Sequence, residues 1–122
     1  MKSAEIFVPC NRVMAKVFDE RVRQEELKDL GKFLWTCADN EITIVTDGGS
    51  SMSRLVTDAE KLVVLGEEFG EVAKEVMENI IGLDMQESAA NANAGKLKLR
   101  KELIQVAAVC VAWVESIDLV VK

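Results

Sequence analysis

Four side chains with oxygen donors, two in each of two separated helical patterns, are the residues of this chain best suited to chemistry. Glu68 and Glu71 stand three apart in a stretch whose apolar residues recur at helical spacing. Glu102 and Gln105 stand three apart in a later stretch that is otherwise apolar almost all the way round. Half-solvated carboxylates repel each other unless a cation joins them, and Mg²⁺ prefers carboxylate oxygens. If the two helices pack antiparallel, these donors would converge on one ion.

A solvated helix face is the ordinary alternative for the first of these patterns. Glutamates spaced three or four apart are common on exposed helices, and Glu71, Glu75 and Glu78 could form such a face beside Lys74. Glu102 is more informative, because a charge on an apolar surface is costly unless it is paired.

Length and composition indicate a single all-α domain over residues 1–122. Half of the 122 residues are apolar, there is one Pro, and His and Tyr are absent. The formal charge of −6 argues against a nucleic-acid polymer or an anionic membrane as partner. Without His, metal sites built on His and Ser-His or Cys-His nucleophile pairs are excluded.

The cysteine pattern and the apolar runs indicate a cytoplasmic protein without a membrane anchor. Cys10, Cys37 and Cys110 are isolated from one another, so neither a zinc site nor a disulfide framework is expected. The longest uncharged run, residues 103–114, is too short to span a bilayer.

Helices are predicted to carry the candidate donors. A first helix should open at Pro9 and end near Gly31, followed by an aromatic cluster at 33–35 that either packs in the core or stacks on a ligand ring. Residues 38–56 are predicted to form a loop with one short extended segment at 42–45.

A capping box, Thr57-Asp58-Ala59-Glu60, predicts that the second helix begins near Asp58 and runs to about Ile81. Gly66 and Gly70 are expected on its buried side, where another helix could approach closely. The side expected to be buried is formed by Leu62, Leu65, Phe69, Val72, Ala73, Val76 and Ile80.

After a connector at 83–95, the last helix should run from about Lys96 to near the C-terminus. A helix that is apolar all round needs cover on most sides, and a bundle of about four helices can hardly provide it. We therefore expect a homodimer or homotetramer with this helix near the interface. A central position within the monomer would explain the same pattern.

The two donor patterns resemble the EExxE…ExxD signature of the MazG-like all-α NTP pyrophosphohydrolases. EEFGE at residues 67–71 and ELIQ at residues 102–105 carry the resemblance. It extends to ERVRQ at 20–24 and to the longer strings at 67–74 and 102–115, as in small phage or mobile-element members. The family has Asp where this chain has Gln105, and a WG where this chain has Leu30-Gly31.

The resemblance implies an enzyme that uses Mg²⁺, or Mn²⁺, to hydrolyse a (d)NTP to the (d)NMP and pyrophosphate, in nucleotide-pool house-cleaning. It places the metal on Glu68, Glu71, Glu102 and Gln105. The carboxylates that could take a proton are Glu67, Glu71 and Glu102. The candidates for substrate contacts are Arg23, Gln24, Lys74 and Lys101, with Arg100 beside them. The alternative is a catalytically inactive nucleotide-binding or protein-interaction module in which Gln105 marks a lost active site.

Overall fold

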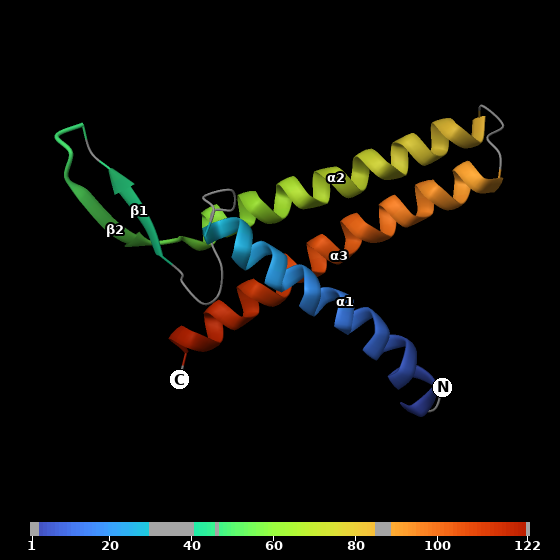
Figure 1. Cartoon of the computed structure of the whole chain (residues 1–122), viewed down its shortest axis with the longest axis horizontal. Coiled ribbons are helices and arrows are strands. Elements are labelled where there is room, and N and C mark those ends of the chain that lie inside the picture. Colours follow the sequence, from blue (N-terminus) through green and yellow to red (C-terminus); the bar gives the residue numbers. More distant parts are fainter. Residues whose placement is uncertain (1–2, 30–40, 46, 85–88, 122) are drawn as a thin grey trace.

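The computed structural model describes residues 3–29, 41–45, 47–84 and 89–121. These residues form three helices, α1 (Ser3–Asp29), α2 (Asp58–Asp84) and α3 (Ala89–Val120), and two strands, β1 (Glu41–Val45) and β2 (Ser51–Leu55) (Figure 1). The described part of the chain is therefore mostly helical, as predicted. It holds three helices and a β-hairpin where a bundle of about four helices was expected.

Helices α2 and α3 lie side by side and run in opposite directions (Figure 1). Near the start of α2, Lys61 Nζ donates to Ser116 Oγ at 3.0 Å. Near its end, Asn79 Nδ2 donates to the backbone oxygen of Gly95 at 3.5 Å. Residues late in α3 therefore face residues early in α2, which is the antiparallel arrangement that convergence of the donors requires.

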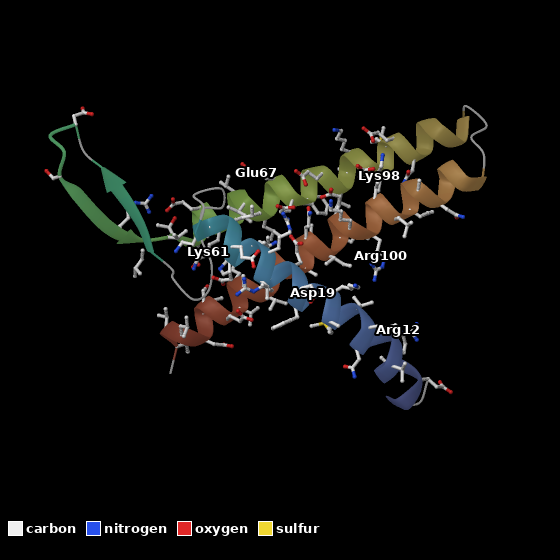
Figure 2. The ribbon with its side chains drawn as sticks, in the orientation of Figure 1. Arg12, Asp19, Lys61, Glu67, Lys98 and Arg100 are labelled. Carbon is white, nitrogen blue, oxygen red and sulfur yellow. The ribbon has the colours of Figure 1, made fainter. Side chains whose placement is uncertain are left out.

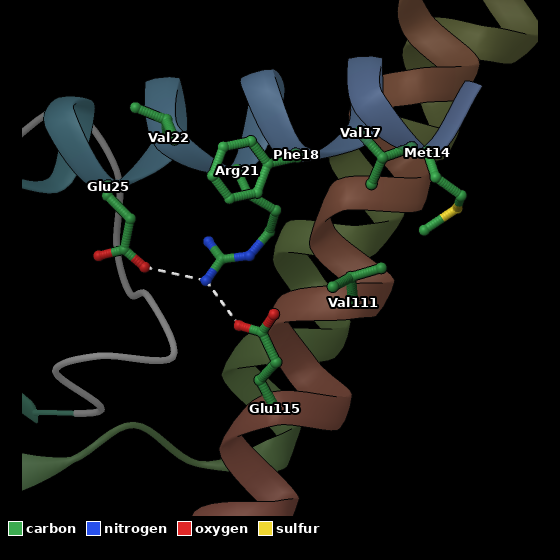
Figure 3. Close-up of a pocket in the computed structure, with 8 residues that line it drawn as sticks. All are labelled: Met14, Val17, Phe18, Arg21, Val22, Glu25, Val111 and Glu115. Carbon is green, nitrogen blue, oxygen red and sulfur yellow. Dashed lines mark hydrogen bonds and ion pairs between the residues drawn. The ribbon is translucent and has the colours of Figure 1, made fainter. Parts of the chain in front are cut away.

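Helix α1 crosses α3 and packs on it through a strip of buried side chains. Val17, Arg21 and Gln24 are at most 8% exposed, and their spacing places them on one face of the helix. Arg21 Nη2 donates to Glu115 Oε2 at 2.8 Å and to Glu25 Oε1 at 3.0 Å (Figure 3). The three side chains line a mainly apolar pocket of about 360 Å³. This ion-pair network fixes α1 against α3.

The core is small and is built around α3, which packs against both other helices. Val56, Val64, Val109 and Ala112 are buried together, and Leu65 and Trp113 pack against them while partly exposed. The indole Nε1 of Trp113 donates to Asp58 Oδ1 at 3.0 Å near the start of α2. Trp113 lies eleven residues after Glu102 in α3, roughly 16 Å further along the helix axis.

Two helices begin earlier than predicted. Helix α1 begins at Ser3 and contains Pro9, so the proline lies inside the helix and does not open it. Helix α3 begins at Ala89, since the alanine-rich part of the expected connector has high helix propensity. Helix α2 begins at Asp58, where the capping box predicted it.

The edge of α2 that packs against α3 agrees only in part with the predicted one. Val72 is buried and Leu65 packs against the core, as predicted, whereas Leu62 is 60% and Phe69 is 64% exposed. Val64, which was outside the predicted side, is buried. The buried edge is the one that carries Glu68, which lies one turn from each of these valines.

The glycines expected at a close helix contact are exposed. A Cβ added to Gly66 or Gly70 would meet nothing within 4 Å. The close approach occurs at Gly95, where a Cβ would collide with the Asn79 side chain. Helices α2 and α3 therefore contact each other closely at Gly95 and Asn79.

The region predicted as a loop forms an antiparallel hairpin. The expected extended segment is β1, and it pairs with β2 in a register that joins Glu41 to Leu55 and Val45 to Ser51. Gly49 in the turn has φ +80°, a left-handed conformation that glycine adopts without strain. The predicted break at Gly31, the aromatic cluster at 33–35 and Cys37 lie outside the described residues.

Within the described residues, one helical window, Asn93–Val120, is long and apolar enough to cross a membrane by length and composition alone. The core helix of a soluble protein passes the same test. Here that window belongs to α3, which carries the contacts to α1 and α2.

Candidate metal centre

Glu68, Glu71 and Glu102 meet between α2 and α3. One carboxylate oxygen of each residue lies within 4.8 Å of one from each of the others. Glu68 and Glu102 are half-buried and Glu71 is exposed, so the group opens to solvent on one side. Two residues from one turn of α2 and one residue of α3 therefore form an oxygen-rich site, and all three were predicted from the sequence.

Gln105, the fourth predicted donor, lies on the same side of α3 as Glu102 and is 8% exposed. With its amide nitrogen turned toward the carboxylates, it donates to Glu102 Oε2 at 2.7 Å and to Glu68 Oε2 at 3.1 Å. In this orientation the amide stabilises the two anions. The opposite rotamer would present its carbonyl oxygen to the same place, as a metal ligand would require.

The electrostatics of the group favour a bound cation. The pKa of Glu102 is raised to about 7, first by burial and then by a hydrogen bond with Glu71 and the charges of Glu71 and Glu68, with Lys101 opposing the shift. Burial also raises the pKa of Glu68, with the charges of Glu71, Glu20 and Glu67 adding to the effect and Arg23 opposing it. Both shifts come first from burial and then from neighbouring carboxylates, and a bound cation would oppose both effects.

The donor set fits a hard divalent ion. Three carboxylates and one amide are the oxygen ligands that Mg²⁺ and Mn²⁺ prefer, and softer metals would favour Cys or His. A cation held by Glu68, Glu71 and Glu102 would relieve the repulsion that raises the pKa of two of them. The residues present therefore fit the metal that the motif resemblance implies.

Helix α1 contributes side chains to the border of the site. Arg23 Nε donates to Glu20 Oε2 at 2.8 Å and to Oε1 at 3.0 Å. This hydrogen bonding raises the pKa of Arg23, and the charges of Glu68 and Glu102 add to the shift. Arg23 is thus close enough to the carboxylate group to act on its charge.

Gln24 lies beneath the site and is 1% exposed. Its Nε2 donates to the backbone oxygen of Gln105 at 3.5 Å and to Glu20 Oε1 at 3.4 Å. Its Oε1 is buried and has no hydrogen-bond partner among the residues that the structure describes. The side chain links α1 to the turn of α3 that carries Gln105.

The other residues predicted for the site lie outside the group formed by Glu68, Glu71 and Glu102. Glu67 is exposed on α2, outside the group, and acts on Glu68 through its charge. Lys74 is 73% exposed and lies 4.0 Å from Glu78 Oε1. Lys101 is exposed next to Glu102 and lowers its pKa, against the larger effect of burial.

Glu20 is a member of the site that the sequence reasoning did not assign. Its charge raises the pKa of Glu68, and its carboxylate orients Arg23 and accepts from Gln24. The spacing of Glu20, Arg23 and Gln24, three and four apart within ERVRQ, would have placed them on one helix face. That face could have been assigned to the site only by knowing how α1 crosses α3.

Comparisons of the chain with protein-family models, with curated proteins and with solved structures found no match. What supports a function is therefore the geometry of the carboxylate group together with the motif resemblance.

Proposed function

We propose that this chain is a Mg²⁺-dependent nucleoside triphosphate pyrophosphohydrolase, which converts a (d)NTP to the (d)NMP and pyrophosphate. The supporting observation is the convergence of Glu68, Glu71 and Glu102, from two helices, with oxygens within 4.8 Å of one another. These are the residues to which the resemblance assigns the metal. In the same proposal, the protein acts in the cytoplasm as a homo-oligomer.

In this proposal, one set of residues binds the cation and a separate residue accepts a proton. Glu68, Glu71 and Glu102 would hold the cation, with Gln105 as a neutral fourth donor. When bound, the ion would offset triphosphate charge and polarise a phosphoryl oxygen. Glu67 stands outside the group and is exposed, so it is free to accept a proton from an attacking water.

The position of the group suits an anionic substrate despite the acidic composition of the chain. Glu71 is exposed, so a ligand can reach the site from solvent. Arg23 and Lys101 border the carboxylates and would meet phosphate oxygens there.

The test is an assay of standard and modified NTPs with Mg²⁺, scored for both pyrophosphate and the nucleoside monophosphate. We expect the two products in equal amounts, loss of activity with EDTA, and its return with Mg²⁺ or Mn²⁺. Release of orthophosphate in place of pyrophosphate would contradict the proposed bond cleavage.

A binding module is the second candidate function. Phe69 and Leu62 on α2 are 64% and 60% exposed, which favours a surface that meets another protein. Absence of product from every NTP in the panel would favour this alternative over the enzyme.

A further inference from the structure

A pocket of about 330 Å³ lies between α1 and α3, beside the carboxylate group. Four of its lining residues are cations, two from each helix: Lys16, Arg23, Arg100 and Lys101. Its acidic members are Asp19 and Glu20. We call the part lined by these six residues the anion groove.

The charge of the anion groove is opposite to that of the whole chain, which carries a formal charge of −6. Glu20 forms an ion pair with Arg23, whose guanidinium donates hydrogen bonds to both carboxylate oxygens of Glu20. Among the lining residues, Asp19 is then the one further acid beside Lys16, Arg100 and Lys101, and Lys101 also borders Glu102 of the carboxylate group. A concave surface with an excess of cations attracts anions more strongly than the same charges spread over a convex one.

The anion groove and the carboxylate group share a border. Arg23 lines the groove, and the charges of Glu68 and Glu102 raise its pKa after the larger effect of Glu20. Lys101 also lines the groove and directly precedes Glu102 in α3. An anion in the groove would therefore lie next to a cation held by the carboxylates.

We propose that the anion groove binds the pyrophosphate end of the substrate, the β and γ phosphates, while the carboxylate group acts at the α phosphate. This inference rests on the proposed function, because it assigns the orientation of the triphosphate in that site. The ligand recognised is a chain of at least two phosphates, whatever base it carries. Inorganic pyrophosphate and inorganic triphosphate should therefore bind on their own and inhibit the reaction.

The experiment measures binding of inorganic triphosphate in Mg²⁺ by calorimetry. The test variant is Lys16→Ala with Arg100→Ala, which removes one cation from each wall of the groove. The matched control is Arg12→Ala with Lys98→Ala, which removes one cation from each of the same helices outside it. Figure 2 labels Arg12, Lys98 and Arg100. It shows Lys98 on the side of α3 that faces α2, and Arg100 on the side of α3 away from α2. All four side chains are on exposed residues, so both variants should fold, which circular dichroism checks.

We expect the test variant to raise the Kd for triphosphate about tenfold or more, and the control to change it less than about threefold. Nucleoside monophosphate binding should change little in either variant, because the groove takes the other end of the substrate. Equal weakening in both variants would show a general effect of charge and would overturn the proposal.

The outcomes separate this inference from the proposed function. If no NTP is hydrolysed but triphosphate binding still depends on Lys16 and Arg100, the enzyme proposal fails and the anion groove stands. If NTPs are hydrolysed and the test variant binds triphosphate as tightly as the wild type, the groove is overturned and the enzyme proposal stands.

Discussion

At the scale of single residues, Glu102 differs most from the solvated glutamates of the same chain. It is half-buried on α3, within reach of Glu71, and its pKa rises to about 7, first through burial. Glu78, by contrast, is 54% exposed and lies 4.0 Å from Lys74 Nζ. The same residue type is thus a metal-ligand candidate in one place and a surface ion pair in the other.

Glu102→Gln should lower kcat/KM for NTP hydrolysis by at least about 100-fold, since it removes one of three charged ligands. Mg²⁺ affinity, measured by calorimetry, should fall in parallel. Glu78→Gln is the control, because it removes a carboxylate from α2 outside the group. Hydrolysis unchanged by Glu102→Gln would rule out the proposed site.

The metal-free protein should lose stability as pH rises. The pKa values of Glu68 and Glu102 are both raised in the folded state, so folding favours their protonated forms. Their contribution is fully present below pH 4.5 and is lost as pH rises toward about 7. In a chelator, the melting temperature should decrease as pH rises from 4.5 to about 7. The Glu102→Gln variant should show a smaller decrease over the same pH range. Mg²⁺ affinity should increase over the same range, because the metal competes with these protons.

Gln105→Asp should make the protein more dependent on Mg²⁺. The substitution removes an amide that can donate to Glu102 and Glu68 and adds a fourth negative charge beside them. We expect a lower melting temperature in EDTA than for the wild type, a larger increase on adding Mg²⁺, and retained activity. Gln105→Asn, which has the shorter side chain without the charge, is the control. A variant with the same Mg²⁺ response as Gln105→Asn would show that the fourth charge does not act on the ion.

At the scale of elements, the start of α2 is stabilised by local hydrogen bonds. The backbone N–H of Glu60 donates to Thr57 Oγ1 at 3.2 Å, and the backbone N–H of Thr57 donates to Glu60 Oε1 at 3.2 Å. Arg54, at the end of β2, donates to both carboxylate oxygens of Glu60, and this holds the pKa of Glu60 at about 2. The capping box therefore joins the hairpin to the helix that carries two of the candidate ligands.

Thr57→Ala should lower the free energy of unfolding by about 1 kcal/mol, because one N–H at the start of α2 loses its acceptor. Chemical denaturation measures the change. Thr57→Ser keeps the hydroxyl and should retain most of the stability. An equal loss in both variants would show that the threonine methyl group, and not the cap, is responsible.

At the scale of the whole molecule, the surface is larger than a compact monomer requires. The accessible surface is 8801 Å², whereas a folded monomer of 13.5 kDa exposes roughly 6,500 Å². Several apolar side chains of α2 contribute to this surface, with exposures of 39% to 64%: Leu62, Val63, Phe69, Val76 and Met77. Burying about 800 Å² on each partner would suffice for a stable dimer.

Light scattering at micromolar concentration should therefore give the mass of a dimer or tetramer. Phe69→Glu should shift the protein toward the monomer, because it places a charge in the exposed apolar face of α2. Lys74→Glu alters charge on the same helix without removing apolar surface and should leave the mass unchanged. A wild-type monomer would refute the predicted assembly.

The residues that make up the carboxylate group could be predicted from the sequence because each signal is local. The spacing of Glu68 and Glu71, the spacing of Glu102 and Gln105, and the Thr57 capping box depend on helix geometry within a few residues. The β-hairpin was half predicted: an extended segment was expected at 42–45, within a loop, but the polar composition of β2 concealed its strand.

Only the tertiary structure decided which faces meet. Helical periodicity allowed either edge of α2 to be buried, and the packing of α3 chose the edge with Val64, Glu68 and Val72. The crossing of α1 over α3 brought Glu20 and Arg23 to the carboxylates and placed Lys16 in the anion groove. These contacts join residues far apart in the chain, and their geometry depends on how whole helices pack, which no local spacing specifies.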